Sequence, residues 1–169
     1  MRDSSLKWIW LSVLIIFLDQ VSKYFIIRNF QLFEVSPVFP GLNLTFVHNV
    51  GAAFSLLSEA GGWQRWFFVT LSSVVGVGIV IWLSRTPASQ RWLAGALAFI
   101  LGGAVGNLID RVRFGYVVDF IDVYIQQWHW YTFNVADSAI TIGAVMLVID
   151  TFWLDRAHVS TNAGKPKGG

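Results

Sequence analysis

Two uncharged apolar stretches constrain the fold more than any other feature of this sequence. They cover residues 66–83 and 92–109, and each runs for 18 residues without a charged side chain. As an α-helix, 18 residues extend over about 27 Å, which is close to the thickness of the hydrocarbon core of a bilayer. We therefore expect both stretches to be transmembrane helices.

Two further stretches are apolar but contain charged residues. Residues 8–27 include Asp19 and Lys23, and residues 135–154 include Asp137. The first stretch has the basic start of a cleaved signal peptide, but no small-x-small cleavage site follows its apolar run, which favours a retained helix. The predicted fold class is therefore an all-α integral membrane protein with four transmembrane helices.

The composition agrees with a membrane protein. Of the 169 residues, 55% are hydrophobic and 13% are charged, whereas soluble proteins carry about 25% charged residues. The 9 Trp and 14 Phe are typical of membrane-interface belts. The absence of cysteine excludes disulfides and thiol catalysis, and a formal charge of +2 is too small to indicate a nucleic-acid partner. We predict one integral membrane domain over residues 1–169, with a disordered tail over about 158–169.

The distribution of basic residues predicts the orientation of the helices. The tails 1–7 and 155–169 and the loop 84–91 hold seven Lys and Arg, whereas the longer segments 28–65 and 110–134 hold four. By the positive-inside rule, both termini are expected in the cytoplasm and the two longer segments on the periplasmic side.

The first outer segment contains the pattern of a β-strand. In "LNLTFVHN" (42–49) apolar and polar residues alternate, and prolines and a glycine precede it. Together with "FQLFEV" (30–35), this pattern predicts a small outer β-sheet on the membrane surface. The stretch "GAAFSLLSEAGGWQRW" (51–66) is expected to be an interfacial segment. Its first part, "GAAFSLL" (51–57), together with the outer sheet, is expected to close over a site as a lid.

Polar side chains gather at the level where the outer ends of the helices are expected. Ionisable groups at membrane depth are costly to desolvate and are therefore functional candidates. A structural explanation also exists for some of them, because Asp19 and Lys23 share one helix face and can form an ion pair. The neighbours Asp110 and Arg111 are explained equally well as an interfacial salt bridge, and Asp122 is expected to be solvated. The candidates are Asp19, Lys23, Asn49, Asn107, Asp110, Arg111, Asp119, Asn134 and Asp137.

Asp119 and Asp137 are the strongest catalytic candidates. Asp119 lies between apolar residues in "VVDFI" (117–121), so its charge should be poorly hydrated. Asp137 follows Asn134 at position N3 of the last helix, where the dipole favours a carboxylate, so a structural cap is an equal alternative. Two carboxylates in a low-dielectric site can share a proton and activate water against an amide, one as base and one as acid. The helix end favours the charge on Asp137 and the proton on Asp119.

Other chemistries fit the sequence less well. His48, His129 and His158 are dispersed and no His-Glu-x-x-His occurs, which argues against a metal site. Ser22 and Lys23 are adjacent, so on a helix they point to different faces and do not form a Ser–Lys pair. No phosphate loop or dinucleotide fingerprint is present, and we predict no cofactor.

Five blocks of this sequence resemble the lipoprotein signal peptidases, or signal peptidase II. The resemblance covers the chain apart from its tails, and the blocks occur in the family's order. They are "DQVSK" (19–23), "NVGAAFS" (49–55), "GGAVGNLIDR" (102–111), "VVDF" (117–120) and "FNVADS" (133–138).

The resemblance implies an aspartyl endopeptidase of the bacterial inner membrane. Such an enzyme removes the signal peptide of a prolipoprotein on the amino side of its diacylglyceryl-modified cysteine and is inhibited by globomycin. We expect the chain to be a monomer among membrane lipids. Asp119 and Asp137 would be the catalytic dyad. The residues that would contact or orient the substrate are Asn49, Asn107, Arg111 and Asn134, and those that would support the site are Asp19, Lys23 and Asp110.

Two alternatives belong to other classes of protein. A small proton-coupled transporter could use Asp119 and Asp137 as a proton relay, although the chain shows neither the broken helices nor the repeats typical of transporters. A structural membrane protein could use the same polar groups to lock its helices together.

Overall fold

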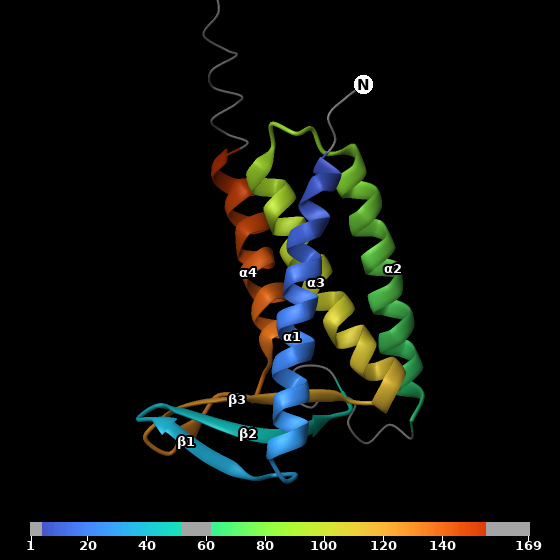
Figure 1. Cartoon of the computed structure of the whole chain (residues 1–169). Helices are drawn as coiled ribbons and strands as arrows, with labels where there is room; N and C mark the ends of the chain where they lie inside the picture. The colour runs from blue at the N-terminus through green and yellow to red at the C-terminus, as the bar shows by residue number, and fades with distance from the viewer. Residues whose placement is uncertain (1–4, 52–61, 155–169) are drawn as a thin grey trace, which may run out of the picture.

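Four long helices side by side make up most of the computed structural model, which describes residues 5–51 and 62–154 (Figure 1). Each is long and apolar enough to span a membrane, as predicted, and Val135–Phe152 forms the last of the four spans. A 3-10 turn, η1 (Ser5–Trp8), precedes the first helix and a π-helical turn, η3 (Asp150–Leu154), follows the last. The helices are α1 (Ile9–Asn29), α2 (Trp63–Arg85), α3 (Arg91–Phe114) and α4 (Val135–Ile149).

The end of α3 differs from the expected one. The helix continues to Phe114, five residues beyond the uncharged stretch that ends at 109. It ends where Gly115 adopts a left-handed conformation (φ 86°) and donates its N–H to the Arg111 carbonyl. Asp110 and Arg111 therefore lie on the last turns of α3.

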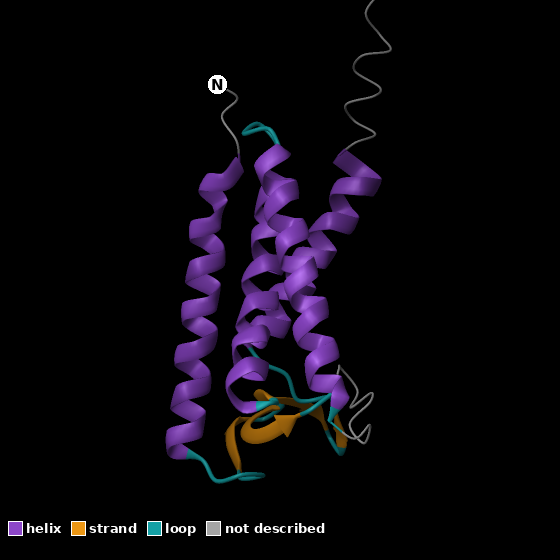
Figure 2. Ribbon diagram, turned by 90° about the vertical axis from the view of Figure 1, so that its right-hand side faces the viewer, coloured by secondary structure: helices purple, strands orange, loops and turns teal. Residues whose placement is uncertain are grey.

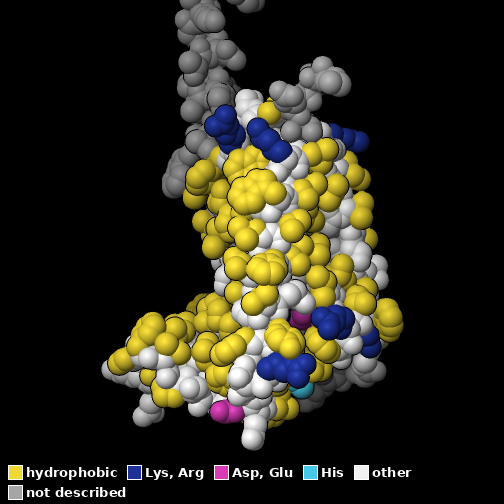
Figure 3. Space-filling model, in the orientation of Figure 1, with side chains coloured by type: hydrophobic (Ala, Val, Ile, Leu, Met, Phe, Trp, Pro, Cys, Tyr) yellow, Lys and Arg dark blue, Asp and Glu magenta, His cyan; other side chains and the backbone are white. Residues whose placement is uncertain are grey.

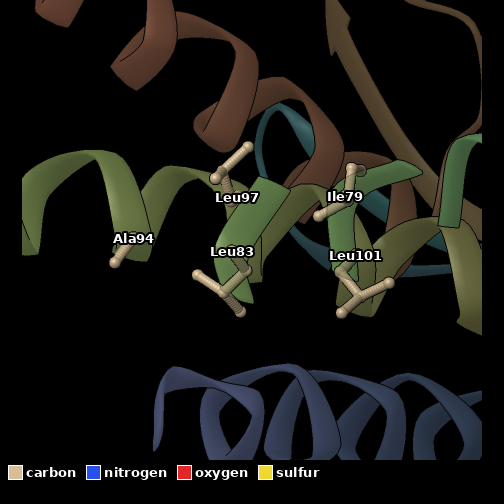
Figure 4. Close-up of a cluster of buried hydrophobic side chains, with 5 residues drawn as sticks. All are labelled: Ile79, Leu83, Ala94, Leu97 and Leu101. Carbon is tan, nitrogen blue, oxygen red and sulfur yellow. The ribbon is translucent and has the colours of Figure 1, made fainter. Parts of the chain in front are cut away.

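The helix α3 lies at the centre of the bundle. It contacts the other three helices. Of the most apolar 18-residue stretch of α3, 61% is buried, against 28% or less for the corresponding stretches of the other spans. Small residues bring α3 and α4 together, because a Cβ on Gly103 would collide with the Ala136 carbonyl. Between α2 and α3 lies an apolar cluster, drawn in Figure 4, of Ile79, Leu83, Ala94, Leu97 and Leu101.

The outer surface of the bundle is apolar. Large hydrophobic side chains are exposed along α1 and α2, including Phe17, Phe25, Val74 and Trp82. Figure 3 shows hydrophobic side chains over most of this face of the bundle, a hydrophobic belt with Lys and Arg side chains at both of its ends. A surface of this kind is stable against lipid and not against water.

A four-stranded antiparallel sheet lies across one end of the bundle, at the opposite end from the N-terminus (Figures 1 and 2). The small sheet and the four helices agree with the predicted fold class. In the order in which they pair, the strands are β1 (Val35–Phe39), β2 (Leu42–Asn49), β3 (Val117–Ile125) and β4 (Trp128–His129).

The strands only partly match the expected ones. The strand β2 coincides with the predicted alternation over 42–49. The first strand was expected at 30–35, but the chain turns there and β1 starts only at Val35, because Phe33 takes a left-handed conformation (φ 68°). The strand β3 was not predicted, since Asp119 and Asp122 interrupt its apolar pattern.

Asp122 is buried and not solvated as expected. Its side chain is 5% exposed, and its carboxylate accepts a hydrogen bond from the Asn43 amide at 2.9 Å. His129 Nδ1 lies 2.8 Å from the same carboxylate. These two partners come from neighbouring strands. Hydrogen bonds within the sheet therefore replace those that water would make to an exposed Asp122 carboxylate. Most of the expected interfacial segment (52–61) and the tail from 155 lie outside the described residues.

Candidate active site

A cavity of about 730 Å³ lies where the sheet meets the bundle. Residues from β2, β3, α3, α4 and the segment 130–133 line it. Most of its wall is apolar, and its polar groups converge from four elements. They include Asn49, Asn107, Arg111, Asp119 and Asp137.

Asp119 faces this cavity from near the start of β3. Its side chain is 2% exposed, and its carboxylate accepts hydrogen bonds from Asn49 Nδ2 at 2.8 Å and from Asn134 Nδ2 at 2.6 Å. Burial, and then the negative charge of Asp137, raise the pKa of Asp119 from 3.8 to about 7, although the two amide donors oppose the shift. A carboxyl group in this position can hold a proton at neutral pH.

Asp137 lies at position N3 of α4, as predicted, and completes a capping box with Asn134. The Asp137 N–H donates to Asn134 Oδ1 at 2.9 Å, and the Asn134 N–H donates to Asp137 Oδ2 at 3.3 Å. The other Asp137 oxygen, Oδ1, accepts from Asn107 Nδ2 at 2.7 Å. The cap and a role in the site are therefore compatible, because the same carboxylate reaches the helix end and the cavity.

Asn134 connects the two aspartates. Its Oδ1 accepts from the backbone of Asp137 while its Nδ2 donates to the carboxylate of Asp119. The chain segments that carry the two carboxylates, β3 and the start of α4, are thereby held around one fully buried amide. Two carboxylates in such surroundings can keep one proton between them and act on a water molecule as acid and base.

A buried cluster of charges lies beneath the two aspartates. Lys23 Nζ is 2.8 Å from Asp19 Oδ2 and 2.9 Å from Asp110 Oδ2, and all three side chains are at most 2% exposed. The ion pair between Asp19 and Lys23 was expected. Asp110 joins this cluster instead of pairing with Arg111.

Arg111 lies at the cavity wall. Its guanidinium donates to the Gly51 carbonyl at 2.9 Å and lies over the Phe68 ring, 4.9 Å from the centroid. The structure thus brings together Asn49, Asn107, Arg111, Asn134 and both aspartates. The cluster of Asp19, Lys23 and Asp110 contacts this site through Asn107 and the backbone of Ala136.

Two polar residues of this region were not singled out from the sequence. Gln20 donates to Asp110 Oδ1 at 2.9 Å, and Arg65 donates to the carbonyls of Arg111 and Val112, both at 2.9 Å. A polar side chain inside an apolar helix was the available signal for Gln20, whereas nothing local distinguishes Arg65. Among residues 5–51 and 62–154, no group of three or more His, Cys, Asp or Glu could hold a metal ion.

The sequence of residues 11–153 matches the profile of the Signal peptidase (SPase) II family. This chain belongs to the signal peptidase II family. A lipoprotein signal peptidase from Alteromonas mediterranea is 49% identical to it over 168 residues, which cover 99% of this chain and 92% of that protein. The corresponding protein from Acinetobacter baumannii is 53% identical over 90% of this chain and 86% of its own length. The one from Escherichia coli O157:H7 is 46% identical over 92% and 94%.

Solved structures share the fold of this signal peptidase II family member. A bacterial membrane enzyme determined by the in meso method at 2.3 Å superposes with a TM-score of 0.78, with 30% identity over 96% of this chain and 93% of that chain. A second such structure, at 1.9 Å, gives the same TM-score with 31% identity over 90% and 98%. The arrangement of four helices and a sheet is therefore common to both.

Proposed function

We propose that this chain is a membrane aspartyl endopeptidase that removes the signal peptide of diacylglyceryl-modified prolipoproteins on the amino side of the lipidated cysteine. Membership of the signal peptidase II family supports the reaction class. The observation that carries the catalytic assignment is the single buried Asn134 amide group, which contacts both Asp119 and Asp137 beside a cavity.

The reaction follows from the different surroundings of the two aspartates. Asp137, at the start of α4, takes a proton from a water molecule, whose oxygen attacks the carbonyl carbon of the scissile amide. Asp119, with its pKa near 7, gives its proton to the carbonyl oxygen. When the tetrahedral intermediate collapses, the C–N bond breaks and the proton now on Asp137 passes to the leaving amine. Asp119 recovers its proton from the hydroxyl as the new carboxyl group forms.

The remaining site residues divide between the dyad and the substrate. Asn49, Asn107 and Asn134 already donate to the aspartates, so we assign them to orienting the dyad and, through it, the scissile bond. Among the hydrogen bonds of the described residues, Arg111 makes none to the two aspartates. Its guanidinium faces the cavity beside Gly51, where it can donate to a substrate carbonyl.

The site and the membrane fit the proposed substrate. Apolar residues of the cavity wall, such as Val117, Ile140 and Ile142, suit an apolar peptide and the acyl chains on its cysteine. We place the protein in the bacterial inner membrane with both termini in the cytoplasm and the sheet on the periplasmic side, on the basis of the charge asymmetry of the sequence. Described residues of one chain build the cavity, which fits a monomer.

The test is cleavage of a lipidated prolipoprotein by detergent-purified protein. Asp119→Asn and Asp137→Asn should each lower the rate by about 10²-fold or more, because each removes one acid–base group. Asp122→Asn is the matched control, since this buried carboxylate lies on the same strand and bonds to Asn43 and not to the dyad. It should retain activity.

Several outcomes would contradict this proposal. Near-normal cleavage by both folded dyad variants would remove the assignment, and proton flux without cleavage in proteoliposomes would favour the transporter. Reversible loss of activity on adding a chelator would require a metal-dependent mechanism.

A further inference from the structure

Lys23 has an unusual position for a lysine in an apolar helix. Its ammonium is buried and lies within hydrogen-bond distance of three oxygens, namely Asp19 Oδ2 at 2.8 Å, Asp110 Oδ2 at 2.9 Å and Asn107 Oδ1 at 3.0 Å. An ammonium has three donors and no acceptor, so every donor of Lys23 has a partner.

Two of these partners also accept hydrogen bonds from the backbone next to the dyad. Asp19 Oδ1 accepts the N–H of Ala136 at 2.9 Å, and Asp110 Oδ2 accepts the N–H of Val118 at 3.1 Å. Ala136 directly precedes one aspartate of the dyad, and Val118 directly precedes the other. Lys23 therefore joins the two backbone segments whose spacing sets the spacing of the dyad.

The third partner, Asn107, reaches Asp137 itself. Because the ammonium of Lys23 cannot accept a hydrogen bond, the Asn107 atom that faces it must be the carbonyl oxygen. The amide N–H groups of Asn107 are consequently turned toward Asp137, where Nδ2 donates to Oδ1 at 2.7 Å. The same oxygen also accepts a longer hydrogen bond from Asn134 Nδ2 at 3.3 Å, so Lys23, at 3.0 Å, is the closer of two donors that set this orientation. Among the hydrogen bonds of the described residues, loss of Lys23 leaves the longer bond alone to hold the Asn107 oxygen. A rotated amide would present its oxygen to Asp137, which suits a protonated carboxyl group and not an ionised one.

We propose that Lys23 is a positioning residue of the dyad, which acts through the Asn107 amide to keep Asp137 in the ionised form that a general base requires. This inference rests on the proposed function, since it assumes that Asp119 and Asp137 do the chemistry. It assigns Lys23 more than a structural ion pair, because the direction of the Asn107 amide decides which protonation state of Asp137 is favoured.

Other charged and titratable side chains also face the dyad, so the test must separate charge from amide orientation. In the described structure they come from α1, β2, α3 and the segment 130–133, and they are Asp19, His48, Asp110, Arg111 and Tyr131. Lys23 with Asp19 and Asp110 carries a formal charge of 1 − 2 = −1. The double variant Asp19→Asn with Lys23→Met preserves this value while it removes the contact to Asn107.

The experiment compares pH–rate profiles for cleavage of a lipidated prolipoprotein by the wild type, Asp19→Asn, and Asp19→Asn with Lys23→Met. We expect the loss of Lys23 to lower kcat and to move the acid limb to higher pH by at least about half a unit, because the ionised carboxylate loses an N–H donor. The value of KM should stay near that of the parent variant. A residue with only a structural role would reduce the amount of folded enzyme without moving the profile.

Gln20→Met is the matched control. Gln20 bonds to the same two carboxylates, Asp19 at 3.2 Å and Asp110 at 2.9 Å, but not to Asn107 in the described structure. Its loss should therefore leave the profile in place. An unchanged profile in the folded double variant, or an equal shift in Gln20→Met, would overturn the role of Lys23. Undiminished cleavage by Asp119→Asn and Asp137→Asn would instead overturn the proposed function, so the two failures are distinguishable.

Discussion

At the scale of single residues, amide groups hold the two carboxylates of the site in place. Asn49 donates to Asp119 and Asn107 donates to Asp137, so each aspartate has its own amide partner, and Asn134 joins them. Burial, and then the negative charge of Asp137, raise the pKa of Asp119 to about 7, so this group can hold a proton at neutral pH. An asparagine can lower the pKa of such a carboxyl group by donating a hydrogen bond to it, without adding a charge.

This arrangement predicts a pH dependence. Since the pKa of Asp119 is raised to about 7, activity should fall as the pH rises through this value and the acid loses its proton. In Asn49→Leu the ionised form of Asp119 loses a donor that lowers its pKa, so the alkaline limb should move to higher pH. The measurement is the pH–rate profile of each enzyme, and a limb that stays in place or moves to lower pH would contradict the assignment of the proton to Asp119.

At the scale of helices and strands, the close contact of α3 with α4 determines where the dyad lies. Gly103 allows the backbone of α4 to approach, since any Cβ there would meet the carbonyl of Ala136, one residue before Asp137. The strand β3 is in turn held to α3 through Asp110 and the Val118 N–H. The helix α3 therefore fixes both segments that carry an aspartate.

Gly103→Ala adds a single methyl group, but we expect it to lower both the stability and the activity of the enzyme. Overpacking of this kind costs about 1–3 kcal/mol, and the displaced start of α4 should also lower the rate of cleavage. The matched control is Gly78→Ala on α2, where a Cβ would meet nothing within 4 Å and alanine favours the helix. Thermal unfolding in detergent and the cleavage rate measure both effects. Equal behaviour of the two variants would show that the α3–α4 contact does not control the site.

At the scale of the whole molecule, an apolar bundle carries its polar site at one end. The hydrophobic belt of Figure 3 fits a lipid environment, and the sheet in Figure 1 lies at the end opposite to the N-terminus. The cavity is bounded by both parts. A substrate with an apolar helix and a lipidated end could therefore keep its apolar parts in the membrane while its scissile bond reaches the aspartates.

The proposed orientation can be tested with single cysteines, because the chain has none of its own. Ser89 lies between α2 and α3 and Gln127 between β3 and β4, and both are exposed. In whole cells, a membrane-impermeant maleimide should label Gln127→Cys from the periplasm and Ser89→Cys only after the membrane is opened. The reverse pattern would invert the proposed topology.

The sequence by itself determined the features that depend on local composition. The four spans follow from length and hydropathy, β2 follows from its alternation, and the start of α4 follows from Asn134 and Asp137, because a cap is made within three residues of chain. It did not predict β3, whose acidic residues become acceptable only beside Asn43, Asn49 and Asn134.

Only the tertiary structure decided which polar groups meet. Lys23 and Asn107 are 84 residues apart, and Asn49 and Asp119 are 70 apart, so no local pattern could pair them. Their contacts exist because small residues let α3 and α4 approach closely and because the sheet closes one end of the bundle. The sequence thus supplies the carboxylates and amides, whereas packing sets the direction of each hydrogen bond and, with it, the charge state on which the proposed chemistry depends.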